Sequence, residues 1–193
     1  MAKNYRTCYT TVKIWSIQSI DAYRHLLRYG SLRGDYRRVH LADRPAYRWM
    51  SEQLRQRSVA NCTGSFVWAW HTYSAEYKRP DLRRRHHLPL GTKGVRIELE
   101  VDRQEVLLSL VDPWICVLRG TYVPISTAEA AMYDLLQGRR RGRREIRKTW
   151  PRIFDLSLRH RALWGRSKQY SIQACMPMID ISQVRDVRFF TAK

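Results

Sequence analysis

The side chains in this sequence that could take part in chemistry are polar residues on or beside segments rich in aromatic residues. Ser16 and Gln18 end the first alternating segment, Gln173 lies in "SIQACMPM", and Asp81 and Arg83 share the segment "KRPDLR". Hydroxyl, amide, carboxylate and guanidinium groups bind polar ligands through hydrogen bonds and charge. Taken one at a time, each of these residues is more typical of an ordinary structural role.

Established catalytic signatures do not occur in the sequence. It contains no P-loop, no G-x-G-x-x-G, no H-E-x-x-H and no G-x-S-x-G. The six His are scattered, and His86 and His87 lie in a basic stretch, so we expect no metal. The four Cys, at 8, 62, 116 and 175, form no C-x-x-C and no zinc-type cluster. We expect buried neutral thiols rather than disulfides.

The charge balance is strongly basic and bounds the possible partners. Lys and Arg number 36 against 17 Asp and Glu, which gives a formal net charge of +19. Such a field attracts polyanions, and phosphate contacts supply most of the non-specific affinity for nucleic acid. We expect a nucleic acid as partner, with RNA favoured over DNA. An acidic antitoxin or inhibitor protein is the alternative partner.

Targeting signals are also missing from the sequence. The first residues, "MAKNYRTCYTT", lack the apolar segment of a secretory signal. No apolar run approaches the roughly 20 residues that a membrane span requires. We therefore expect a cytoplasmic protein with no membrane partner.

The polar residues must be positioned by strands and helices that the pattern predicts around them. Residues 10–18 alternate as a strand, and residues 19–30 follow as a helix that Ser19 caps and Gly30 ends. A second helix over 42–57 carries Ala46, Tyr47, Met50 and Leu54 on one face. The sequence predicts further strands over 64–73, with Phe66, Trp68 and Trp70 on one side, and over 94–101. In that last strand Val95, Ile97, Leu99 and Val101 point inward, and Arg96, Glu98 and Glu100 point outward.

The second half of the chain adds a helix at 126–138, a basic segment and two last strands, "YSIQACMPM" and "VRDVRFFTA". Like charges along the basic segment oppose a solvated helix, so we expect an arm that orders on phosphates. In all, about five to seven strands and about three or four helices are predicted. The fold class is α+β, with a split, mostly antiparallel sheet and flanking helices. Residues 1–193 form a single domain with a basic, Arg-rich insertion at 138–148.

Several motifs in one order resemble a bacterial and phage family of proteins of unknown function. The family pattern is WTIQ…PDLR…SIQATFW…FTAR. The segments that carry the resemblance here are "VKIWSIQSIDAYRHLLRYG", "AYRWMSEQL", "VWAW", "KRPDLR", "GVRIELEVDRQEVLLS", "WPRIFDL" and "SIQACMPMIDISQVRDVRFFTAK". The resemblance covers nearly the whole chain except the Arg-rich insertion, and it implies no function by itself.

A more distant resemblance links the chain to DarT-like ADP-ribosyltransferases, which use NAD to modify nucleic acid. In those enzymes a first strand ends in an H-x-T-like motif, and a late strand carries a catalytic Glu. Ser16 and Gln18 fall at the His and Thr positions, and Gln173 falls at or next to the Glu position. The resemblance thus implies that these three residues are catalytic and that NAD is the substrate, without a metal.

The departure at Gln173 bears on the chemistry that the resemblance implies. An amide keeps the hydrogen bond to a ribose hydroxyl, but it has no charge to stabilise an oxocarbenium-like centre and cannot take a proton. Asp81 and Asp180 are candidate substitutes for the missing carboxylate. The resemblance implies contacts to NAD from Trp15, Tyr23, Tyr47, Trp68, Asp81 and Arg83. Contacts to the nucleic acid are expected from Arg139, Arg140, Arg141, Arg143, Arg144, Arg147 and Lys148.

The leading hypothesis is therefore an ADP-ribosyltransferase-like toxin or effector that modifies RNA or DNA with NAD, in phage defence or a toxin–antitoxin setting. One alternative is a non-catalytic basic protein that binds nucleic acid on the same fold. Another is a phage or host protein-interaction factor that acts against a defence system.

Overall fold

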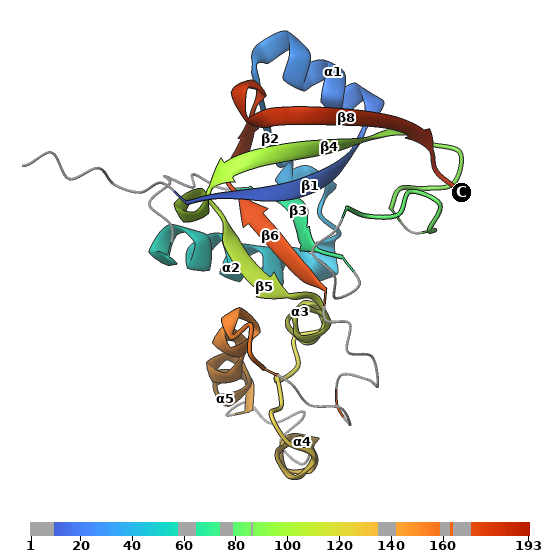
Figure 1. Cartoon of the computed structure of the whole chain (residues 1–193). Helices are drawn as coiled ribbons and strands as arrows, with labels where there is room; N and C mark the ends of the chain where they lie inside the picture. Colours follow the sequence, from blue (N-terminus) through green and yellow to red (C-terminus); the bar gives the residue numbers. More distant parts are fainter. Residues whose placement is uncertain are drawn as a thin grey trace, which may run out of the picture.

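The computed structural model describes residues 10–57, 65–73, 79–85, 87–134, 142–158, 163 and 171–193. Its central element is a sheet of six strands, paired in antiparallel fashion (Figure 1). The strands are β1 (Thr11–Ser19), β3 (Val67–Thr72), β4 (Lys93–Asp102), β5 (Leu107–Leu110), β6 (Ile172–Met176) and β8 (Val184–Thr191). Their order across the sheet is β5-β6-β3-β1-β4-β8, so β1 and β3 lie at the centre.

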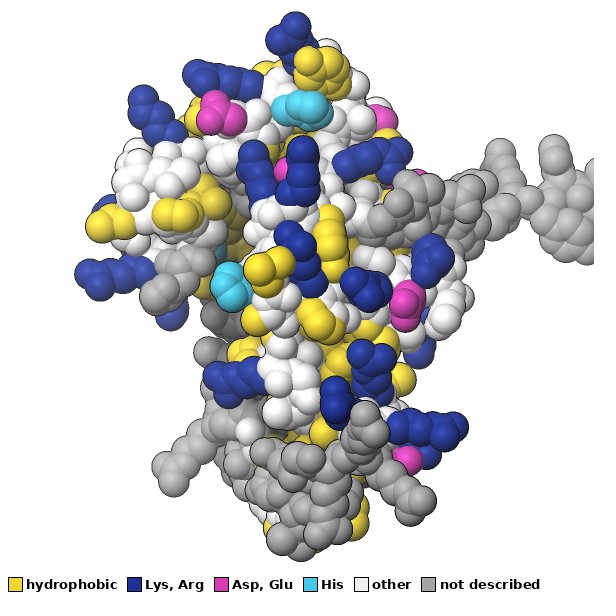
Figure 2. Space-filling model, turned by 180° about the vertical axis from the view of Figure 1, so that it is seen from behind, with side chains coloured by type: hydrophobic (Ala, Val, Ile, Leu, Met, Phe, Trp, Pro, Cys, Tyr) yellow, Lys and Arg dark blue, Asp and Glu magenta, His cyan; other side chains and the backbone are white. Residues whose placement is uncertain are grey.

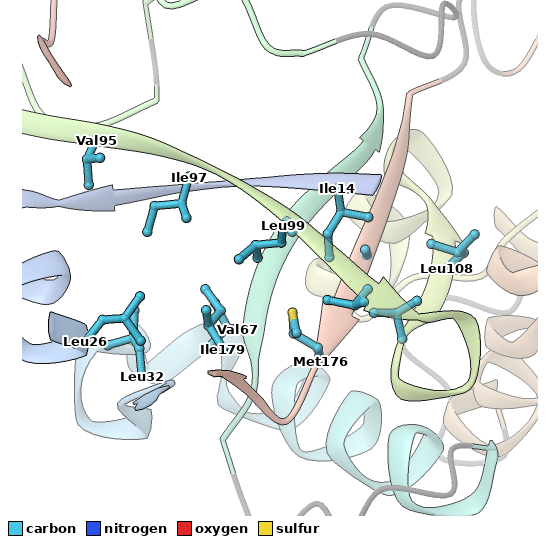
Figure 3. Packing of buried hydrophobic residues seen from close by; sticks show 14 residues of the cluster. Ile14, Leu26, Leu32, Val67, Val95, Ile97, Leu99, Leu108, Met176 and Ile179 are labelled. Atoms are coloured by element: carbon cyan, nitrogen blue, oxygen red, sulfur yellow. The ribbon is translucent and has the colours of Figure 1, made fainter. Parts of the chain in front are cut away.

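One side of the sheet, called the α1 face below, is covered by α1 (Ile20–Tyr29) and a two-stranded ribbon of β2 (Ser31–Arg33) and β7 (Met178–Asp180). Leu26, Leu32 and Ile179 bring these elements into a core with the inward residues of the sheet, such as Ile97 and Leu99 (Figure 3). Every second residue of each strand contributes to this core, because successive side chains of a strand point to opposite faces of the sheet.

The other side, called the α3 face, is covered by α2 (Arg44–Arg57) and α3 (Val111–Leu118). The predicted stripe of α2 packs here: Met50 and Leu54 are fully buried and lie in one cluster with Trp114, Phe66 and the strand residue Cys175. The two faces of the sheet therefore carry separate hydrophobic cores. An α+β chain of this size buries both faces in this way.

The start and the end of α1 agree with the prediction from sequence. Ser19 accepts a hydrogen bond from the backbone N–H of Ala22 at 3.3 Å, which caps the first turn. Gly30 ends the helix with φ at +73°, a left-handed conformation that glycine adopts without steric cost. Because β1 ends at Ser19, the strand passes into the helix without a loop.

The described residues form five α-helices, including α4 (Thr127–Asp134) and α5 (Gly142–Thr149), which lie at one end of the molecule beyond α3 (Figure 1). No helix among them is long and apolar enough to cross a membrane. Short 3-10 helices complete the chain: η1 (Tyr36–Arg38), η2 (Leu41–Asp43), η3 (Arg103–Glu105), η4 (Trp150–Phe154) and η5 (Ile181–Gln183).

The expectation of an irregular basic arm over 138–148 is wrong for its second half, which is helical. Ile146 of α5 is buried in the α3-face core, and this burial favours the helix over the repulsion between its Arg residues. Lys148 also pairs with Glu145 at 2.8 Å, three residues earlier. Residues 138–141 lie outside the described part of the chain.

Candidate functional site

One register row crosses all six strands of the sheet and brings polar and aromatic residues together. Each member is the strand partner of the next, in the order Ser109, Gln173, Trp70, Trp15, Glu98 and Asp186. Strand partners directly opposite each other point to the same side of a sheet. Cys175 lies two residues from Gln173 and packs in the α3-face core, so the whole row faces that side.

Gln173 sits on β6 near one end of this row and is almost fully buried, with 8% of its surface exposed. Its Nε2 donates a hydrogen bond to Oγ of Ser109 on β5 at 3.1 Å. Ser109 itself has no exposed surface. This bond fixes the orientation of the amide, since a buried amide that lacks a partner is costly.

Trp15 and Glu98 hold the centre of the row on β1 and β4. The indole Nε1 of Trp15 donates to a carboxylate oxygen of Glu98 at 2.9 Å, and Nζ of Lys13 lies 2.8 Å from the other oxygen. Burial raises the pKa of Glu98, but the hydrogen bonds from Lys13 and Trp15 and the nearby positive charges together hold it below its ordinary value. Glu98 is therefore a stable carboxylate in the row.

A cleft of about 290 Å³ opens on the α3 face beside this row. Its floor comes from β1, β3 and β6, its rim from α3 and the segment that follows residue 86. The lining residues are Ile17, Trp68, Ala69, Trp70, His87, Trp114 and Gln173. Three tryptophans and one amide in a small concave site suit a planar ring that also carries hydrogen-bonding groups.

Ser16 and Gln18, the other two expected catalytic residues, point to the α1 face. Ser16 pairs with Ile97 and Gln18 pairs with Val95, and both partners belong to the α1-face core. Ser16 is fully buried; its hydroxyl donates to the backbone carbonyl of Trp68 at 2.9 Å and accepts from Nε2 of Gln18 at 2.8 Å. The structure thus does not bring Ser16 and Gln18 together with Gln173.

The aromatic residues expected at NAD fall into different places. Trp68 lines the cleft, and Trp15 is buried beside Trp70 in the row. Tyr47 belongs to the α3-face core: it accepts a hydrogen bond from Nε1 of Trp68 at 3.2 Å, and burial raises its pKa. Tyr23 packs against Phe189 and the α1-face core, away from the cleft.

Asp81 and Arg83 form an exposed ion pair next to the cleft. The guanidinium of Arg83 lies 2.9 Å from the Asp81 carboxylate, and its hydrogen bonds lower the pKa of Asp81 to about 2. The backbone carbonyl of Asp81 is 3.0 Å from Nε2 of His87, a lining residue. Asp180, the other candidate carboxylate, caps η5 and lines a separate cavity of about 370 Å³ with β7.

The expected nucleic-acid contacts are described only in α5. Arg143, Arg144, Arg147 and Lys148 are exposed there, and the guanidinium of Arg147 lies over the Trp150 ring at 5.4 Å. Arg139, Arg140 and Arg141 lie outside the described residues. Basic side chains are spread over the described part of the face in Figure 2, with fewer acidic ones between them.

Sequence reasoning missed Ser109, Trp114 and the roles of Glu98 and Arg96. Alternation predicted Arg96 as an outward residue of β4, but it is buried, with 8% of its surface exposed. The segment at 79–85 covers it: Nη1 of Arg96 donates to the carbonyl of Pro80 at 2.9 Å. A polar residue on the outward side of a strand is exposed to solvent only when no loop packs over that face of the sheet.

Comparison with protein-family models gives a match over residues 13–140 to a family described as a domain of unknown function, DUF3841. The matched segment includes most of β1 and all of β3, β4 and β5, and it ends before β6. No curated protein matches the chain. No solved structure matches it either.

Proposed function

The chain belongs to the DUF3841 family, whose description names no activity, and we propose from its own site that it is an ADP-ribosyltransferase-like enzyme that uses NAD to modify nucleic acid. One observation carries the proposal. The strands whose sequences resemble the functional strands of DarT-like enzymes, β1, β3 and β6, are neighbours in the sheet. On them Trp15, Trp70 and Gln173 form one row beside a tryptophan-lined cleft.

The size and lining of the cleft suit the nicotinamide end of NAD. At about 290 Å³ it lies at the lower limit of the roughly 300–1,000 Å³ typical of small-molecule pockets. A nicotinamide ring in the cleft would contact the indoles of Trp68, Trp70 and Trp114 by stacking or edge contacts. The amide of Gln173 then lies at the wall of the site, where it can donate a second N–H to a ribose hydroxyl.

The proposed reaction is a glycosyl transfer. The bond between ribose C1′ and the nicotinamide nitrogen breaks, and nicotinamide leaves with the bonding electron pair. An oxygen or nitrogen of the nucleic acid bonds to C1′ and loses its proton to solvent water. Positive charge that develops on the ribose is stabilised by a carboxylate in such a site. Gln173 cannot supply it, so we assign this role to Glu98, which keeps its charge in the same row.

The acceptor in this proposal is a nucleic acid, with RNA favoured. The net charge of +19 and the exposed basic side chains of α5 support it, because phosphate contacts dominate such binding. A cytoplasmic location, a toxin or phage-defence setting and an acidic antitoxin partner belong to the same proposal.

The test is to incubate the protein with NAD labelled in its adenylate part and with RNA or DNA. We expect label on the nucleic acid together with free nicotinamide. Gln173→Ala and Trp70→Leu should lower the rate at least tenfold, since each removes a group at the cleft. Thr11→Ala, an exposed change on β1 outside the cleft lining, is the control, and its rate should stay within about twofold of the wild type. If no nicotinamide is released and no acceptor is labelled, the enzyme proposal fails.

A second function, non-catalytic binding of nucleic acid, is favoured by one observation. The lining of the cleft contains no carboxylate among the described residues, and Gln173 donates to Ser109. Under this alternative, NAD leaves the melting temperature unchanged, whereas RNA raises it in a salt-dependent manner. Gln173→Glu separates the two functions further, because it should increase nicotinamide release only if NAD occupies the cleft.

A further inference from the structure

Arg96 is a buried cation next to the cleft that the proposed transfer reaction does not use. On β4 it is the strand partner of Ile17, a lining residue, and of Arg188 on β8. These three residues form the row next to the one that holds Trp15 and Glu98. The side chain points to the same face as the cleft, since Glu98 lies two residues further along β4.

The guanidinium of Arg96 has few partners for a group so deeply buried. Its Nη1 donates to the carbonyl of Pro80 at 2.9 Å. Among the described residues it makes no ion pair within 4.0 Å and no second hydrogen bond. A guanidinium carries five N–H donors, and Arg is almost never buried without a counter-charge. Most of its donors therefore have no protein partner among the described residues.

Two arginines and two carboxylates lie near Arg96. Burial lowers the pKa of Arg96, and the neighbouring Arg79 and Arg188 lower it further, while Asp186 and Glu98 raise it. Glu98 forms an ion pair with Lys13, with 2.8 Å between Nζ and a carboxylate oxygen. Arg79 precedes Pro80 in the segment that crosses over β4, so basic groups approach Arg96 from both the sheet and this segment. Such a cluster is stabilised by an anion between its members.

We propose that Arg96, together with Arg79 and Arg188, forms a binding site for a phosphate group at the end of the cleft. Arg96 supplies the rigid, desolvated fork that suits two phosphate oxygens, and the two exposed arginines close over it from either side. The site binds phosphate esters or anhydrides, from a nucleotide or from a nucleic-acid backbone. It goes beyond the proposed transfer reaction, because it requires binding alone and no cleavage of NAD.

The test measures the binding of inorganic pyrophosphate, ADP and a short RNA to the full chain by calorimetry at constant ionic strength. We expect wild-type protein to bind pyrophosphate, and Arg79→Ser and Arg188→Ser to weaken it about tenfold each. Arg96→Gln should abolish it. Arg24→Ser is the charge-matched control: Arg24 is exposed and paired with Asp21 on α1, so its loss should change the affinity less than twofold.

Two comparisons distinguish the source of the phosphate and protect the test against misfolding. If the natural ligand is a nucleotide, ADP competes with pyrophosphate, and the variants bind RNA as the wild type does. If the natural ligand is nucleic acid, ADP does not compete, and the same variants lose affinity for RNA. Should Arg96→Gln fail to fold, the two exposed variants carry the test. The site is refuted if pyrophosphate does not bind, or if Arg24→Ser weakens it as much as Arg188→Ser. Transferase activity is not needed for either outcome.

Discussion

Ser16 and Gln173 point to opposite faces of one sheet, although only β3 separates the strands that carry them. Ser16 is sealed in the α1-face core, and Gln173 lies at the wall of the cleft on the α3 face. A ligand in the cleft therefore meets Ile17, Trp70 and Gln173 across the strands, rather than Ser16 and Gln18. Ser16 and Gln173 therefore have separate roles, although the resemblance to DarT-like enzymes implies that both belong to one site.

The first prediction concerns the stability that Ser16 provides. Ser16→Ala leaves the buried carbonyl of Trp68 and the amide of Gln18 without their partner. We expect the free energy of unfolding to fall by about 1–3 kcal/mol, the cost of leaving buried polar groups unsatisfied. Urea denaturation measures it. Thr11→Ala removes an exposed hydrogen bond on the same strand and should cost less. Equal losses in the two variants would contradict the role given to Ser16.

The second prediction concerns the pH dependence that Glu98 confers. Its pKa is lowered in the folded chain, so its contribution is present above the ordinary pKa and is lost as the pH falls through the folded value. Glu98→Gln should destabilise the protein by about 1 kcal/mol at pH 7, since it removes a partly buried, hydrogen-bonded charge. The difference between variant and wild type should shrink at pH 3. A difference that persists unchanged in acid would show that packing, rather than charge, is responsible.

The third prediction concerns the ion pair beside the cleft. Carbon-detected NMR titration of the Asp81 carboxyl should give a midpoint near pH 2. Arg83→Gln removes the guanidinium hydrogen bonds and the charge that favour the carboxylate but keeps the hydrogen bond from the backbone N–H of residue 83, so the midpoint should rise part of the way toward the ordinary value of 3.8. Because the folded pKa is lowered, any stabilisation by this pair is present above the ordinary pKa and is lost toward pH 2. A midpoint that does not move would exclude Arg83 as the cause.

The fourth prediction tests α5 as a nucleic-acid contact. The double variant Arg143→Glu and Arg144→Glu reverses two exposed charges without touching buried Ile146. RNA affinity should fall, and the slope of log K against log salt concentration should decrease by about 1–2. The control reverses Arg24 and Arg28 on α1, at the other end of the molecule (Figure 1). If the control lowers RNA affinity equally, the binding depends on the overall positive charge of the protein and not on a local contact with α5.

Much of the secondary structure could be predicted because its signals are local. The alternation of β4, the Ser19 and Gly30 caps of α1 and the apolar stripe of α2 all depend on residues within a few positions of each other. The α+β class and the mostly antiparallel sheet follow from the number and order of these elements.

The candidate site was less predictable because it depends on contacts between distant residues. The pairing of Trp15 with Trp70 decides which side chains share a face with Gln173, and no local pattern encodes that register. Arg96 is buried because residue 80 returns over β4. Likewise, the helix of α5 depends on the burial of Ile146 in a core built from elsewhere in the chain. The repulsion between neighbouring Arg side chains of α5 is weaker than the stabilisation from this burial.

The order of the strands also has a consequence for how copies of the chain behave together. At one edge of the sheet, the edge strand β5 leads directly into α3 and packs against η4. At the opposite edge, β8 is the edge strand. An exposed edge strand can pair with the edge strand of another molecule and start aggregation. Pairing of β8 with β8 of another copy would bring the exposed Arg185 and Arg188 of the two copies close together. The basic composition thus disfavours growth of the sheet from one molecule to the next.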